Sequence, residues 1–196
     1  MGFTIEIGKK APDFSLRGVD DKIYGLKDFE KYKFLIVAFS CNHCPYVIGS
    51  EDRIIAFAQE VAVKNVGFVA INSNEDKDHP LDSFLHMVKK AKDKQFSFPY
   101  LRDETQDVAK GYGAERTPNF FLLDQNRTVV YTGRMDDNPK EASLAKTHEL
   151  RDALEALLAG QTIAVPVTQA IGCNIKWWSK DAHWMPNDLC DFIGKT

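Results

Sequence analysis

The sequence predicts an α/β fold in which a mixed central sheet has helices on both sides. Residues 34–39 and 66–71 are continuous apolar runs, which are typical of strands buried on both faces. Between them, residues 45–63 carry apolar side chains near one broad face, as an amphipathic helix does. A strand, a helix and a strand in this order predict a parallel pair joined by a right-handed crossover.

Three further helices and two hairpins follow from apolar periodicity and turn residues. The helices are expected over about 79–94, 106–112 and 147–158, and the hairpins pair 11–16 with 23–26 and 120–123 with 128–132. The second hairpin brackets a polar turn, so its strands are antiparallel neighbours. Helices therefore fall both between the strands and after the last strand, and the sheet is mixed.

The chain divides into a domain over residues 1–160 and a C-terminal extension over 161–196. All three tryptophans lie in this tail, at positions 177, 178 and 184. Disordered segments rarely carry so much aromatic surface. We expect the aromatic tail to pack on the domain or across an oligomer interface, and a homodimer is one candidate.

Charge and hydropathy argue against two classes of partner. The net charge of the 196 residues is −3, with no run of basic residues, so we expect no nucleic-acid partner. The N-terminus lacks a basic segment followed by an apolar one, and the apolar runs are too short to cross a bilayer. We expect no membrane contact and a cytoplasmic location.

The cysteines are few and unevenly placed. Cys41 and Cys44 form a C-x-x-C pair, while Cys173 and Cys190 lie in the tail. Four cysteines in a chain of this length do not make a disulfide scaffold. In a reducing compartment, a C-x-x-C pair beside a strand–helix–strand unit predicts a redox motif.

The motif lies where a buried strand gives way to a helix, and the positive end of a helix stabilises a thiolate. We expect Cys41 to be the more exposed thiol and the nucleophile, and Cys44 to resolve the mixed disulfide. His43 would lower the pKa of the Cys41 thiol by a hydrogen bond or a charge. Pro45 disfavours helical geometry at Cys44, so a later helix start and less distinct roles for the two cysteines stay open.

Metal binding is the non-enzymatic alternative. A structural zinc site needs a second cysteine or histidine pair at ligand spacing, and the sequence has none. We therefore expect no structural metal. A soft-metal binding module that uses Cys41, Cys44 and His43 stays open.

Four segments together resemble the thioredoxin-like superfamily, and within it the alkyl hydroperoxide reductase/thiol-specific antioxidant (redoxin) branch. They are residues 8–14, 40–46, 116–124 and 131–134. The resemblance implies a thioredoxin-like fold, thiol–disulfide oxidoreductase and antioxidant activity, and a protein or low-molecular-weight thiol partner, without a cofactor. It also implies a cis Pro118 facing the C-x-x-C motif, with Thr117 and Pro45 as further substrate contacts.

The peroxidase members of this branch give a competing enzyme. Peroxiredoxins typically carry a Pro-x-x-x-Thr-x-x-Cys pattern, to which this sequence can be compared. With its cysteine laid on Cys44, Cys41 stands in place of the threonine and Val37 in place of the proline. The activating arginine would fall at Pro118, with Arg116 displaced by two positions. These three departures count against a peroxiredoxin, and a thiol peroxidase using Cys44 is kept as the alternative.

The tail holds a third candidate thiol. Cys173 follows Gly172, and some members of the branch carry a similar Gly-Cys…Lys-Trp stretch. Cys173 would then serve as a relay or resolving thiol. A small buried hydrophobic residue is the other interpretation, since free cysteine is often buried. Cys190 is expected to take part only in packing.

Overall fold

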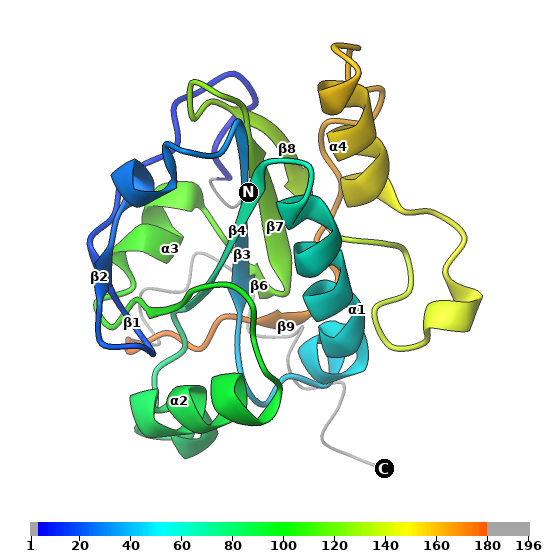
Figure 1. Ribbon diagram of the computed structural model, residues 1–196. Coiled ribbons are helices and arrows are strands. Elements are labelled where there is room, and N and C mark those ends of the chain that lie inside the picture. Colours follow the sequence, from blue (N-terminus) through cyan, green and yellow to red (C-terminus); the bar gives the residue numbers. More distant parts are fainter. Residues whose placement is uncertain (1–3, 180–196) are drawn as a thin grey trace.

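The computed structural model describes residues 4–179 (Figure 1). Its main sheet has the strand order β2-β1-β5-β4-β3-β7-β8, and a second small sheet joins β6 and β9. The strands are β1 (Leu16–Gly18), β2 (Ile23–Tyr24), β3 (Phe34–Ser40), β4 (Val66–Asn72), β5 (Tyr100–Arg102), β6 (Arg116–Thr117), β7 (Asn119–Leu123), β8 (Val129–Gly133) and β9 (Cys173–Asn174). The helices are α1 (Pro45–Ala62), α2 (Phe84–Asp93), α3 (Asp107–Tyr112) and α4 (Glu149–Leu158), with the 3-10 turns η1 (Leu26–Phe29), η2 (Pro80–Asp82) and η3 (Ala142–Leu144).

The centre of the sheet confirms the predicted mixed pairing. Strands β3 and β4 are parallel and α1 connects them, whereas β3 and β7 are antiparallel. In each pair the register runs along the strands without interruption. The carboxyl end of β3 is therefore held between two neighbours, and the C-x-x-C motif follows this end directly.

Alternate side chains of the central strands enter two separate cores. In β3, Leu35, Val37 and Phe39 belong to one cluster, and the residues between them belong to the other. Residues of α3 and the N-terminal segment complete the first cluster; α1 and α4 complete the second. Figure 1 shows α3 on one side of the sheet and α1 with α4 on the other. Both faces are thus covered, as the apolar runs predicted.

The helix expected over 79–94 is interrupted. The turn η2 ends at Asp82, the backbone at Ser83 is extended (φ −61°, ψ 155°), and α2 starts afterwards at Phe84. This break leaves the Asp82 side chain fully buried instead of on a solvated first turn. The N-terminal hairpin is also shorter than expected, because only β1 and β2 pair around Asp21, whose φ is +64°.

The described part of the tail runs along the domain. Val167 bridges to Thr132, and β9 pairs with β6. Ile175 and Trp177 are buried in the same core cluster as α3. Trp184 and Cys190 lie outside the described residues. Among residues 4–179, no helix has the length and apolar character that crossing a membrane requires.

Candidate active site

The C-x-x-C motif spans the junction between β3 and α1. Strand β3 ends at Ser40, and Cys44 is the N-cap of α1, with extended backbone angles (φ −64°, ψ 125°). Pro45 takes the first helical position, where a missing N–H costs nothing. The helix thus has the later of the two starts that the sequence left open. The helix terminus therefore acts mainly on Cys44 and not on Cys41.

Contacts from three elements hold the loop between the two cysteines. The Asn42 amide donates to the carbonyl of Leu81 (2.7 Å) and accepts from the hydroxyl of Tyr100 (2.9 Å). The Lys90 ammonium donates to the backbone carbonyl of Asn42 (3.0 Å). The turn η2, the strand β5 and the helix α2 each supply one of these contacts, so the loop is held from three sides.

Both thiols of the motif are buried, with 1% of Cys41 and 0% of Cys44 exposed. The expectation of a more exposed, accessible Cys41 is therefore wrong, because neither sulfur of the motif reaches the surface. Thr117 lies against both cysteines: its hydroxyl is 3.2 Å from the Cys41 sulfur, and its carbonyl accepts from Cys44 (3.2 Å). A strand–helix junction predicts an accessible thiol only when no distant segment covers it.

The peptide between Thr117 and Pro118 is cis, as the resemblance implied. Strand β6 ends at Thr117 and β7 begins at Asn119, so the sheet positions this peptide opposite the motif. Pro45, the next residue after Cys44, is exposed. The structure thus brings Cys41, Cys44 and Thr117 into one cluster and leaves Pro45 at its exposed edge.

The surroundings shift the pKa values of the two thiols in opposite directions. Burial raises the pKa of Cys41 well above its ordinary value. Hydrogen bonds from Cys173 and Cys41 lower the pKa of Cys44, together with the backbone of Val47 in the first turn of α1. These directions favour ionisation of Cys44 over ionisation of Cys41 in the reduced pair, and a Cys44 thiolate would give up its hydrogen bond to Thr117. A low pKa also makes Cys44 the better leaving group.

Asp82 is the functional candidate that the sequence analysis missed. Its carboxylate accepts from the backbone N–H of Asn42 (2.5 Å), from Nδ1 of His43 (2.6 Å) and from the Asn74 amide (2.7 Å). Burial raises the pKa of this carboxyl, but these hydrogen bonds outweigh burial and hold the pKa below its ordinary value. Asp82 lies forty residues from the motif in the sequence, in a segment expected to be helical, so no sequence signal distinguished it.

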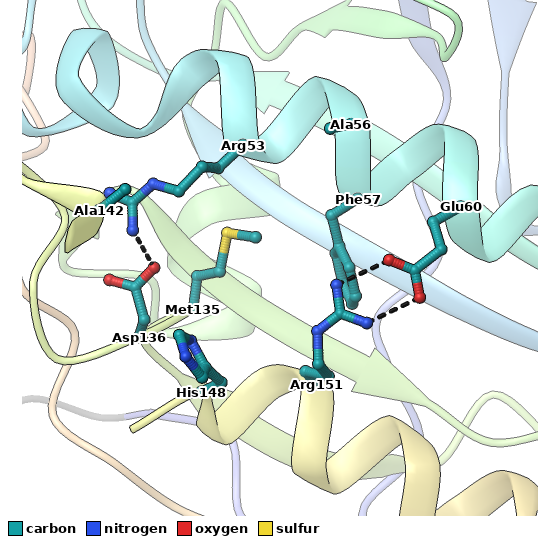
Figure 2. A pocket seen from close by; sticks show the side chains of 9 residues that line it. All are labelled: Arg53, Ala56, Phe57, Glu60, Met135, Asp136, Ala142, His148 and Arg151. Atoms are coloured by element: carbon teal, nitrogen blue, oxygen red, sulfur yellow. Dashed lines mark hydrogen bonds and ion pairs between the residues drawn. The ribbon is translucent and has the colours of Figure 1, made fainter. Parts of the chain in front are cut away.

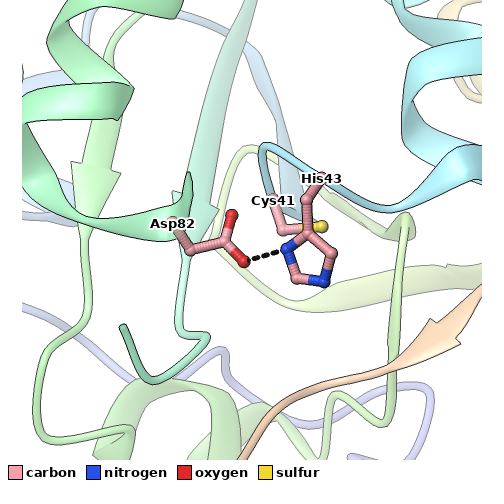
Figure 3. Close-up of side chains that lie close together, drawn as sticks. All are labelled: Cys41, His43 and Asp82. Carbon is pink, nitrogen blue, oxygen red and sulfur yellow. Dashed lines mark hydrogen bonds and ion pairs between the residues drawn. The ribbon is translucent and has the colours of Figure 1, made fainter. Parts of the chain in front are cut away.

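His43 is half-buried between Asp82 and a second histidine. Figure 3 shows its ring turned with Nδ1 toward Asp82 and with the Cys41 sulfur nearby. Since the carboxylate is ionised, Nδ1 carries the proton and Nε2 is the free ring nitrogen. The ring also stacks on His79 at a centroid distance of 5.2 Å. Asp82 therefore fixes both the orientation and the tautomer of His43.

The same residues form the metal-ligand group found in the described part of the chain. Cys41, His43 and Asp82 offer ligand atoms that lie within 4.8 Å of one another. This set differs from the Cys41, Cys44 and His43 set considered from the sequence. Both Asp82 oxygens already accept hydrogen bonds, and a metal would have to replace some of them.

Cys173 reaches the motif from the tail. Strand β9 pairs with β6 so that Cys173 stands opposite Thr117. Its half-buried side chain packs against the cluster of Cys41, Cys44 and Val47. The relay thiol considered from the sequence thus lies beside the redox pair.

A separate pocket of about 260 Å³ lies between α1 and α4 (Figure 2). Its two arginines are paired with carboxylates: Arg53 with Asp136 (2.5 Å) and Arg151 with Glu60 (2.7 Å). No cysteine is among its lining residues. We assign it no part in the thiol chemistry.

Comparisons with known proteins identify the family and the fold. The Redoxin family profile matches residues 6–149. An uncharacterized conserved protein from Geobacillus kaustophilus has a solved structure with 39% identity and a TM-score of 0.84, over 90% of this chain and 94% of that one.

Two further proteins extend the comparison. The thiol-disulfide oxidoreductase ResA of Bacillus thuringiensis is 28% identical over 64% of this chain and 68% of its own length. A putative thioredoxin from Neisseria meningitidis (22% identity, TM-score 0.54, 64% of this chain and 79% of that one) shows the shared fold alone. The fold is thioredoxin-like, and the chain belongs to the Redoxin family.

Proposed function

We propose that this redoxin catalyses reversible exchange between the Cys41/Cys44 dithiol or disulfide and a protein or low-molecular-weight thiol partner. The observation that carries the proposal is the pairing of two thiols whose pKa values are shifted in opposite directions, lowered at Cys44 and raised at Cys41, with both sulfurs 3.2 Å from Thr117. Such a pair combines a good leaving group with a neighbouring thiol at the mouth of a helix. The name of the ResA relative supports the same reaction class.

Because the pKa of Cys44 is lower than that of Cys41, we expect a partner thiolate to attack the sulfur of Cys41. In the oxidised protein, a partner thiolate attacks the sulfur of Cys41, the Cys41–Cys44 bond breaks, and Cys44 leaves as the thiolate. A second partner thiolate then attacks the partner sulfur of the mixed disulfide, and Cys41 leaves and takes up a proton. The partner loses two electrons and the Cys41/Cys44 pair gains them.

His43 and Asp82 suit the second half of this exchange. Their ligand atoms and the Cys41 sulfur lie within 4.8 Å of one another. Asp82 holds Nδ1 of His43 and thereby keeps the ring beside Cys41, where an imidazole can pass a proton to the leaving sulfur. His43 is thus the proton donor in this proposal, and Asp82 is the positioning residue.

Access to Cys41 requires a local rearrangement. The hydroxyl of Thr117 contacts the Cys41 sulfur, so a partner sulfur has to displace it. The half-buried His43 and the exposed Pro45 offer the surface on which a partner would first dock. The sulfur contact with Thr117 is weaker than the nitrogen and oxygen bonds that hold Asn42, so Thr117 is expected to yield first.

A direct test follows the oxidation of a small dithiol peptide by the oxidised protein. In a Cys173→Ser background, the protein is expected to convert one equivalent, whereas adding Cys41→Ser or Cys44→Ser leaves none. Cys190→Ser is the matched control, because the sequence assigns Cys190 to packing, and it should behave as the wild type. Full conversion by either motif variant would contradict the proposal.

The stabilised Cys44 thiolate also favours a second candidate, a thiol peroxidase. Peroxide consumption by the same variants separates the two functions. If Cys41→Ser keeps peroxide turnover while Cys44→Ser loses it, the protein is a peroxidase that uses Cys44. If neither variant changes a low rate of consumption, the exchange reaction is favoured.

A further inference from the structure

Strand β9 presses the tail closely onto β6. A Cβ atom added at Gly172 would lie 2.1 Å from the carbonyl oxygen of Thr117 and 3.0 Å from the nitrogen of Pro118. Only glycine fits there. The Arg116 guanidinium donates to the carbonyl of Gly172 (2.9 Å), and the Ile175 N–H donates to the carbonyl of Glu115 (3.0 Å). Cys173 therefore has a fixed place next to Thr117.

Three cysteines consequently surround one residue. Thr117 contacts the sulfurs of Cys41 and Cys44 and pairs across the small sheet with Cys173. Cys173 packs against the other two, and it is half-buried where they are inaccessible. Cys173 is thus the best-exposed thiol of the cluster.

The tail is anchored on the other side of Cys173 as well. The backbone N–H of Lys176 donates to the Asn74 amide oxygen (2.9 Å), and that of Trp178 donates to Gln106 (3.0 Å). With β9 paired on one side and these bonds on the other, Cys173 cannot move far. A thiol held this way meets its neighbour at high effective concentration.

We propose that Cys173 is a third redox thiol, which forms an intramolecular disulfide with Cys44 and carries the oxidising equivalent toward the surface. This inference rests on the proposed exchange function. The Cys173 thiolate attacks the Cys44 sulfur of the Cys41–Cys44 disulfide, that bond breaks, and Cys41 leaves as a thiolate. Cys41 takes up the proton that Cys173 lost, so the step is a rearrangement without net oxidation.

The new disulfide is more accessible than the one it replaces. A partner thiolate that attacks Cys173 expels Cys44, whose low pKa favours its departure. The hydrogen bond from Cys173 to Cys44 also indicates that the two sulfurs face each other. Partner access through Cys173 avoids the rearrangement at Thr117 that access to Cys41 requires.

Disulfide mapping by mass spectrometry tests the proposal. Every variant carries Cys190→Ser and is oxidised with diamide, then alkylated and digested without reduction. The Cys41→Ser variant is expected to form an intramolecular Cys44–Cys173 bond. Adding Gly172→Ala should abolish this bond, because the new methyl group displaces β9, whereas adding Gly111→Ala should leave it, since that Cβ meets only Pro12 at 3.4 Å.

The outcomes separate this inference from the proposed function. If Cys41→Ser keeps two free thiols or links only between molecules, while Cys173→Ser still forms the Cys41–Cys44 bond, Cys173 has no relay role and the exchange function stands. If the protein with all three thiols forms no disulfide, both proposals are wrong.

Discussion

Cys41 and Cys44 are separated by two residues, yet their thiols have opposite surroundings. Cys44 caps α1, and hydrogen bonds from Cys173 and Cys41 lower its pKa. At Cys41, burial is the largest influence and raises the pKa. Local rules about strand–helix junctions supported the C-x-x-C pair, and the family resemblance implied the cis proline. It could not reveal that Thr117, far away along the chain, covers both sulfurs.

The thiolate of Cys44 should be visible in a pH titration followed by ultraviolet absorbance. Because its pKa is lowered, the thiolate signal should appear well below the ordinary cysteine pKa of about 8.5. Cys44→Ser should lose this signal. Cys173→Ala should move it to higher pH, and Cys173→Ser should move it less, because the hydroxyl still donates. A signal that stays in Cys44→Ser would contradict the assignment.

Asp82 gives a residue-scale prediction on stability. Its pKa is lowered in the folded protein, so its contribution is present above the unfolded value of about 3.9 and is lost as the pH falls through the folded value. Asp82→Asn should therefore cost about 1.5–3 kcal/mol at neutral pH and much less in acid. Urea unfolding at several pH values measures this. Asp52→Asn, on the exposed face of α1, is the control, and an equal loss at every pH would contradict the account.

The sequence predicted the strands that are buried on both faces. Strands β3, β4 and β7 are mostly continuous apolar runs, and the structure buries nearly every residue in them. Strand β5 was missed, because three residues that include Arg102 give no such signal. The break at Ser83 was missed as well, since it depends on Asp82 bonding to a loop forty positions earlier.

Shortening a buried side chain of a central strand should strongly destabilise the fold. Phe121 in β7 is fully buried, and its ring meets Phe39 and Tyr112 edge-on. Phe121→Ala should lower the free energy of unfolding by about 3–5 kcal/mol. Leu85→Ala, at an exposed site on α2, should change it by less than about 0.5 kcal/mol. Denaturant unfolding compares them, and similar losses would argue against this packing.

At the scale of the whole molecule, the tail belongs to the same folded unit as the sheet. Trp177 is 6% exposed and lies in the core cluster with α3, whereas its neighbour Trp178 is 46% exposed. The aromatic content of the tail predicted packing, but two-residue strands such as β9 leave no trace in a sequence. Their placement depends on Gly172 and on the edge that β6 offers.

This difference between adjacent tryptophans makes the tail testable. Trp177→Ala should cost about 3–5 kcal/mol in a single cooperative transition, because it opens a cavity in the core. Trp178→Ala should cost about 1 kcal/mol, the value of a hydrogen bond such as the one its indole donates to Glu104. Thermal unfolding followed by calorimetry checks both. Equal effects would mean that the tail is not part of the core.

The central claim is that Cys41 and Cys44 form one reversible redox pair. A titration with defined ratios of reduced and oxidised dithiothreitol, read out by alkylation and mass spectrometry, tests it directly. In Cys173→Ser, the account predicts a single two-electron transition in which these two thiols disappear together, and its loss when Cys41 or Cys44 is also replaced by serine. Thiols that stay reduced across the whole range, or that oxidise independently of each other, would contradict the account.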